Sequence, residues 1–175
     1  IEKTPSWSAM VHAGVLEPTS WTDGLPIVLG DSGLTMTPIS VPHRDELSDM
    51  HSLLISGPGR SVLFLPDHDD WSETLAHVGA ADIRGWLSMI GADIALLDGT
   101  FWSMDELQHR HQSHVPHPCV SETLERLGPR REDDPEVLFL HLNHTNPLHD
   151  PEGPEYAEVL SLGWAVAEEG MRFTL

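Results

Sequence analysis

The chain has 175 residues, enough for one domain with a hydrophobic core. Its 9 Lys and Arg residues against 28 Asp and Glu residues give a net charge of −19. A surface of that sign repels phosphates and anionic lipid heads, which argues against nucleic acid and membrane as partners. No apolar run approaches the roughly 20 residues that span a bilayer. We expect a soluble protein, with the cytoplasm favoured over other compartments that the sequence leaves open.

The first half of the chain predicts two strand pairs. The stretch "LPIVLGDSGLTMTPI" reads as two strands joined by a turn at Asp31, Ser32 and Gly33. In "HSLLISGPGRSVLFLPD", the apolar runs 53–55 and 62–65 flank a Gly-Pro-Gly turn and predict a second hairpin. We therefore expect residues 26–66 to form antiparallel strands of one sheet.

The second half alternates between helical and strand patterns, which indicates mixed α/β layers. Helices are predicted after residues 82, 118 and 154, on the outside of the molecule, with a further helical stretch at 103–110. Strands near 94–98, 137–141 and 164–174 are expected to form a second sheet, the last of them in a closing hairpin. "ADIALLDGTFW" is continuously apolar before Asp98, as in a strand buried on both faces.

Twelve histidines are the most unusual feature of the composition, and we expect three or four of them to share a site. Three strand ends carry side chains that suit a metal: His43 in "VPHRDE", Asp67 in "LFLPD" and His141 in "LFLHLNHTNP". Imidazole nitrogen and carboxylate oxygen bind Zn²⁺ and Fe²⁺ and leave positions open for water or substrate. Taken singly, each residue could instead be a structural histidine or a turn-forming aspartate.

The order of these motifs resembles the metallo-β-lactamase fold. More narrowly, "VPHRDELSD", "LLDGTFW", "PHPCVSETLERL" and "FLHLNHTNP" are similar to the branch that contains coenzyme PQQ synthesis protein B. The similarity runs from about residue 25 to the C-terminus. It implies an αββα sandwich, an α/β fold of which residues 1–175 form a single domain that is the C-terminal part.

The resemblance also implies which residues bind the metal. His43, Asp67 and His141 would be the ligands of one or two Zn²⁺ ions, or of Fe²⁺ as the alternative, with Asp67 bridging. The family's HxHxDH motif does not occur in these 175 residues. An N-terminal half or a partner chain is therefore expected to supply it.

Two further residues are candidates for catalysis. Asp98 ends a buried strand, and the resemblance implies a carboxylate that orients a histidine or a metal-bound water; a turn-forming role is the alternative. His117 precedes a helix that begins near Pro118, whose positive end favours a neutral imidazole able to relay a proton. His114 is the rival for that position. Asp45 and Glu46 are candidates to orient His43.

Three functions follow from these expectations. The first is a metal-dependent hydrolase that uses metal-activated water on a small-molecule substrate. The second, implied by the resemblance, is an iron-dependent oxidase or hydroxylase that acts on a tyrosine-derived precursor in PQQ-like cofactor synthesis. The third is a binding module that lost its catalytic metal motif and kept the fold.

Overall fold

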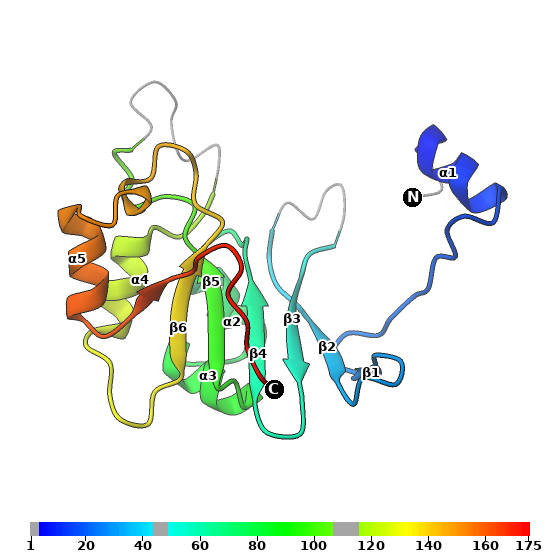
Figure 1. Ribbon diagram of the computed structural model, residues 1–175, viewed down its shortest axis with the longest axis horizontal. Helices are drawn as coiled ribbons and strands as arrows, with labels where there is room; N and C mark the ends of the chain where they lie inside the picture. Colours follow the sequence, from blue (N-terminus) through cyan, green and yellow to red (C-terminus); the bar gives the residue numbers. More distant parts are fainter. Residues whose placement is uncertain (1–3, 44–48, 107–115) are drawn as a thin grey trace.

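The structure, a computed structural model, describes residues 4–43, 49–106 and 116–175. The described residues contain one mixed sheet in which seven strands lie side by side in sequence order (Figure 1). The strands are β1 (Ile27–Val28), β2 (Thr35–Ser40), β3 (His51–Ser56), β4 (Ser61–Leu65), β5 (Ile94–Asp98), β6 (Glu136–Leu140) and β7 (Ala165–Val166).

The pairing direction changes at the middle of this sheet. Strands β1 to β4 pair antiparallel, as expected for residues 26–66, whereas β4 to β7 pair parallel. The expected second sheet is wrong, because Val62 of β4 pairs directly with Ile94 of β5. Parallel neighbouring strands require a crossover connection, which is usually a helix. The change along the sequence from hairpins to alternating strands and helices therefore marks the change from antiparallel to parallel pairing.

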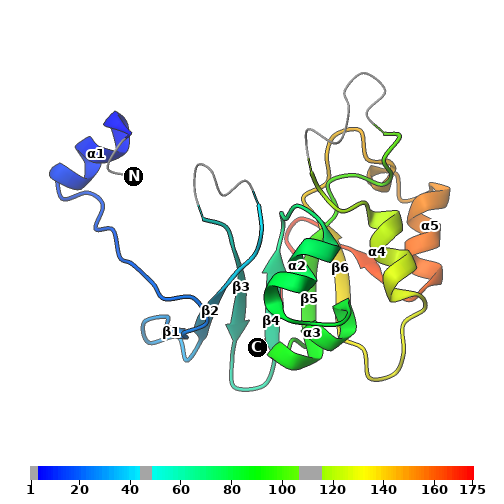
Figure 2. The ribbon, with the colours of Figure 1, turned by 180° about the vertical axis from the view of Figure 1, so that it is seen from behind.

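Helices cover one face of the sheet (Figure 2). They are α2 (Trp71–Val78), α3 (Ile83–Ile90), α4 (Val120–Leu127) and α5 (Pro154–Ser161), and α1 (Pro5–His12) stands apart and buries no residue. Alternate residues of β4, β5 and β6, such as Leu63 and Leu65, enter the larger core cluster with Trp86 and Leu124 from the helices. No helix among the described residues is long and apolar enough to cross a membrane.

The opposite face of the sheet carries a smaller cluster of Val62, Ile94 and Leu138. Phe173 and Leu175 pack against this cluster, and Figure 1 shows the C-terminal segment crossing that face. The predicted closing hairpin is therefore wrong: only β7 joins the sheet, and the residues after it cover apolar side chains instead of pairing. The chain thus supplies one helix layer and one sheet layer.

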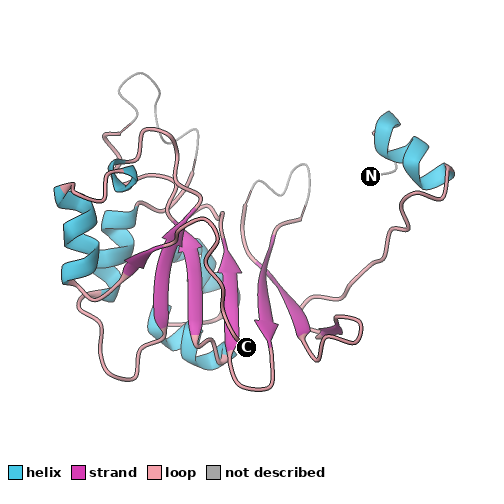
Figure 3. Ribbon diagram, in the orientation of Figure 1, coloured by secondary structure: helices cyan, strands magenta, loops and turns pink. Residues whose placement is uncertain are grey.

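Two local predictions also differ from the structure. Helix α2 was missed, although Asp70 caps it by accepting a hydrogen bond from Glu73 N at 2.8 Å, and this Asp-x-x-Glu spacing is a helix-start signal. Residues 103–106 form turns in place of the expected helix, and residues 107–110 lie outside the described part. Helices α3, α4 and α5 lie where they were predicted, whereas α1 was not predicted (Figure 3).

Strand direction determines where the predicted site residues meet. β2 and β4 are both antiparallel to β3, so they run the same way, and β5 and β6 are parallel to β4. The carboxyl ends of these four strands therefore lie at one edge of the sheet. His43, Asp67, Asp98 and His141 all follow or end these strands, which is the edge where α/β folds place their ligands.

Arg84 of α3 ties the helix layer to the loop before β6. Its guanidinium donates to both carboxylate oxygens of Asp134, at 2.7 and 2.8 Å, and to the backbone carbonyls of Leu127 and Pro129. The hydrogen bonds from Arg84 hold the pKa of the Asp134 carboxyl below its usual value of 3.8. The stabilisation from this ionised carboxylate is complete above pH 3.8 and is lost as the pH falls through the lower folded-state value.

Replacing Arg84 by Met should lower the free energy of unfolding of the full-length protein by about 1.5–3 kcal/mol, because it leaves the Asp134 carboxylate without its main donor. The deficit, measured by urea unfolding, should shrink below about pH 4 as Asp134 becomes protonated. The control is Arg60→Met, which breaks the exposed Arg60–Glu136 pair and should cost about 1 kcal/mol or less. Equal losses in the two variants would contradict this account.

Candidate metal centre

Asp98 is the last residue of β5, and its carboxylate is buried. Oδ1 accepts hydrogen bonds from Thr100 N at 2.8 Å and from Thr100 Oγ1 at 2.7 Å. Oδ2 accepts from His68 N at 3.3 Å and pairs with Nδ1 of His117 at 2.8 Å. A buried carboxylate needs such donors to offset its desolvation. Asp98 therefore holds three separate segments of chain together.

His117 lies three residues before α4, and its side chain is 9% exposed. An ionised carboxylate only accepts, so His117 donates Nδ1–H to Asp98 and leaves Nε2 as its second nitrogen. Burial lowers the pKa of His117, but the hydrogen bond and charge of Asp98 outweigh burial and raise this pKa above 6.5. The rival, His114, lies outside the described residues.

His43 lies three residues after β2, between two carboxylates. Its Nδ1 is 3.0 Å from Oδ1 of Asp69, and its Nε2 is 3.3 Å from Oδ2 of Asp67. The backbone reinforces this arrangement, since Asp69 N donates to Pro42 O at 3.1 Å. Asp69 is thus placed to orient His43. Asp45 and Glu46, the predicted partners, lie outside the described part of the chain.

His141 follows β6 directly and has a φ of +62°, the only positive φ at a non-glycine position among the described residues. That conformation is costly for a residue with a Cβ and is concentrated at functional sites. It turns the chain so that Nδ1 of His141 lies 3.0 Å from Oγ1 of Thr100. Gly99 permits this approach, because an added Cβ would lie only 2.8 Å from Leu140 O.

The loop after His141 is tied to the turn after β5. Asn143 N donates to Thr100 O at 3.0 Å. The amide of Asn146, which is buried, donates to Gly99 O at 2.6 Å. The polar residues at the end of this strand therefore hold the two site loops against each other, while His144 is exposed.

His68 is fully buried behind the site. Its Nδ1 contacts Oγ1 of Thr74 at 2.8 Å, and its ring packs edge-on against Trp71. Burial lowers the pKa of His68 to about 4, so it is neutral near pH 7. Its role is to support Asp98 through its backbone N–H.

The structure brings all five predicted site residues to this edge of the sheet. The ring centroid of His117 is 5.8 Å from that of His43 and 6.1 Å from that of His141, so His117 links the two sides of the site. Single donor atoms of Asp98, His117 and His141 lie within 4.8 Å of one another. That grouping differs from the expected ligands, and the division into ligands and catalytic groups stays a prediction.

The donor set fits a divalent metal such as Zn²⁺ or Fe²⁺. Imidazole nitrogens and carboxylate oxygens occur together here, as such ions require. Oδ1 of Asp67 is buried and has no hydrogen-bond partner within the described residues. It lies 3.2 Å from Nδ1 of His117, but that N–H is already directed at Asp98. A buried carboxylate oxygen without a donor is the kind of atom that a cation would satisfy.

Two residues with a clear structural role at this site were missed in the sequence. Asp69 orients His43, and Thr100 lies between Asp98 and His141. For Thr100 the signal was the "DGT" turn, in which a hydroxyl two residues after an aspartate can bond back to it. For Asp69 the only signal was another acid in "PDHDD".

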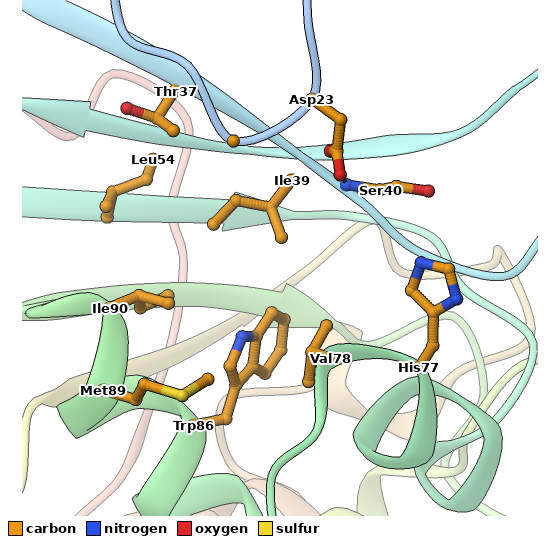
Figure 4. A pocket seen from close by; sticks show the side chains of 11 residues that line it. Asp23, Thr37, Ile39, Ser40, Leu54, His77, Val78, Trp86, Met89 and Ile90 are labelled. Atoms are coloured by element: carbon orange, nitrogen blue, oxygen red, sulfur yellow. Dashed lines mark hydrogen bonds between the residues drawn. The ribbon is translucent and has the colours of Figure 1, made fainter.

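The chain also has an apolar cavity of about 350 Å³ elsewhere, between β2 and β3 on one side and α2 and α3 on the other (Figure 4). Leu54, Trp86 and Ile90 contribute to its walls, and none of the five predicted site residues lines it. The predicted chemistry is therefore separate from this cavity.

A family model described as "Beta-lactamase superfamily domain" matches residues 4–142. Several curated relatives are named coenzyme PQQ synthesis protein B. The Xanthomonas oryzae protein is 30% identical over 162 residues, covering 82% of this chain and 52% of the relative. The Azotobacter vinelandii protein is 30% identical over 181 residues, covering 89% and 57%. The chain thus spans about half the length of these relatives.

A solved structure shares the fold: the crystal structure titled Zn(2+)-bound PqqB from Methylobacterium extorquens. It matches with a TM-score of 0.62 and 22% identity, over 90% of this chain and 52% of the other. The family model covers most of the chain, and the mixed sheet with its single helix layer agrees with this fold. The chain therefore belongs to the metallo-β-lactamase superfamily, with coenzyme PQQ synthesis protein B among its relatives.

Proposed function

We propose that this chain is part of a metal-dependent hydrolase that acts on a small-molecule substrate. The observation that carries the proposal is the meeting of three histidines and two aspartates at the carboxyl edge of the sheet, where Oδ1 of Asp67 is buried and has no hydrogen-bond partner within the described residues. Such a set of side chains can bind a cation and also transfer a proton. A cluster that served only to stabilise the fold would not need both abilities.

His43, Asp67 and His141 would hold one or two zinc ions, and Asp67 would be the ligand shared by both if two were bound. The metal, when bound, would lower the pKa of a water to about 7 and polarise a substrate oxygen. We take residues 1–175 as one domain, the C-terminal part of the sandwich. The remaining HxHxDH ligands would come from an N-terminal half or from a partner chain.

His117 would move the proton. Its Nδ1–H is held by Asp98, so Nε2 is the atom that accepts a proton from the attacking water and returns it to the leaving group. The Asp98 carboxylate stabilises the imidazolium that forms, which agrees with the raised pKa of His117. Asp98 would act through His117 and touch no substrate.

An iron-dependent oxidase or hydroxylase is the second candidate. Two observations favour it: the relatives carry the name coenzyme PQQ synthesis protein B, and the same imidazole and carboxylate donors suit Fe²⁺ as well as Zn²⁺. The same side chains would hold the iron, and the substrate would be a small precursor of such a cofactor.

The metal content of the full-length protein, produced without added metal and measured by elemental analysis, separates the two candidates. We expect zinc at about one or two ions per chain, as the hydrolase requires. Iron in place of zinc would transfer the proposal to the oxidase. Absence of any bound metal, together with no affinity for added zinc or iron, would contradict both.

Replacing His141 by Ala in the full-length protein should remove bound metal and hydrolytic activity together, because this imidazole is one of only three proposed ligands from this chain. Activity can be followed with a panel of chromogenic esters, phosphodiesters and lactams, alongside the metal content. The matched control is His77→Ala, which removes an exposed histidine of α2 and should change neither quantity.

His117→Gln should lower turnover by about 10²–10⁴-fold while metal content stays unchanged, because glutamine can fill the space but cannot carry the proton. Loss of metal comparable to that of His141→Ala would instead make His117 a ligand, as the 4.8 Å grouping with Asp98 and His141 allows. Unchanged turnover would reject any catalytic role for His117.

A further inference from the structure

We propose that Thr100 is a positioning residue that fixes His141 in the Nδ1–H tautomer and so keeps Nε2 free to bind a metal. The Thr100 hydroxyl lies between two partners, Oδ1 of Asp98 at 2.7 Å and Nδ1 of His141 at 3.0 Å.

The number of hydrogens that each group can donate determines the direction of both contacts. A threonine hydroxyl has one hydrogen to donate and lone pairs with which to accept. The ionised carboxylate of Asp98 can only accept, so the hydroxyl hydrogen is directed at Oδ1. The contact with His141 must then run the other way, with Nδ1–H donating to the Thr100 oxygen. A neutral imidazole with hydrogen on Nδ1 carries its lone pair on Nε2.

The Asp98 carboxylate therefore fixes the tautomer of two imidazoles, those of His117 and His141. Asp98 receives Nδ1–H of His117 directly through Oδ2, and it orients the hydroxyl that receives Nδ1–H of His141 through Oδ1. Both histidines consequently offer the same nitrogen, Nε2. Metal-binding histidines commonly have their second nitrogen fixed in this way by a carboxylate or another acceptor.

The backbone conformation on both sides holds Thr100 and His141 in contact. His141 has the positive φ that brings its ring back to Thr100, and Gly99 packs too closely against Leu140 O for any other residue to fit without a shift. Thr100 O also accepts from Asn143 N, so the two loops are linked on both sides of the pair. A strained conformation persists only where its surroundings hold it in place.

The contact matters because His141 is exposed, and a neutral histidine side chain in water prefers the Nε2–H tautomer. Without Thr100, the imidazole would return to that form and would have to exchange its proton before Nε2 could bind a cation. The effect on metal affinity rests on the function proposed above. The tautomer itself does not, because it can be measured in metal-free protein.

The test is ¹⁵N NMR of the His141 ring in metal-free full-length protein, at a pH where the imidazole is neutral. The wild type should show a non-protonated Nε2. Thr100→Val, which keeps the shape but removes the hydroxyl, should shift His141 toward the Nε2–H form, and Thr100→Ser should restore the wild-type signal. Zinc affinity should fall about 10–100-fold in Thr100→Val and recover in Thr100→Ser.

Thr123→Val is the matched control, because it removes another buried threonine hydroxyl, one that bonds Trp71 and Cys119 instead of a site histidine. It should leave the His141 signal unchanged. An Nε2–H signal in the wild type would overturn the proposal without any variant, even if Thr100→Val fails to fold. An unchanged His141 signal in folded Thr100→Val would also overturn it. A correct tautomer shift with no zinc affinity in the wild type would leave the positioning role intact and count against the metal function.

Discussion

The buried carboxylate of Asp98 is the interaction on which this site depends. It is 1% exposed and receives four hydrogen bonds, two from Thr100 and one each from His68 and His117. These donors come from the turn after β5, the loop after β4 and the segment before α4. Removing any one of them would leave a charged group partly unsatisfied in the interior, which costs about 1–3 kcal/mol or more. The arrangement of these three segments is therefore linked to the position of the proton on His117, which donates its Nδ1–H to Asp98.

The sheet supplies the second constraint. Four strands run in one direction and end at one edge, which brings together side chains that are up to about a hundred residues apart in sequence. The inward-facing residues of these strands, such as Leu65 and Leu97, are fully buried against the helix layer. The positions of the strand ends are therefore fixed independently of any ligand. Rigid strands with short polar ends are a suitable support for a metal centre.

Much of this could be predicted from the sequence, because the relevant signals are local. Apolar runs and glycine-containing turns identified β1 to β4, and the abrupt polar endings after β4, β5 and β6 identified Asp67, Asp98 and His141. Helix α2 could also have been found, from its Asp70 cap. These features depend on backbone preferences and burial that act over a few residues.

Other features depend on contacts between distant segments and leave no such pattern. Whether β4 pairs with β5 or begins another sheet is decided by packing over the helix layer, and the C-terminal residues Phe173 and Leu175 cover the sheet without any strand signal of their own. The pairing of Asp69 with His43 is likewise a tertiary contact, over 26 residues. The roles of individual donors at the site depend on hydrogen-bond direction, which only the assembled geometry defines.

The most direct test of a metal centre at this edge is a crystal structure of the full-length protein with anomalous scattering recorded at the absorption edge of its metal. The account predicts an anomalous peak about 2.0–2.2 Å from Nε2 of His141 and from a carboxylate oxygen of Asp67. In the same structure, Nδ1 of His117 should still bond Asp98. A peak located away from this edge of the sheet, with His43, Asp67 and His141 still bonded only to protein atoms, would contradict it.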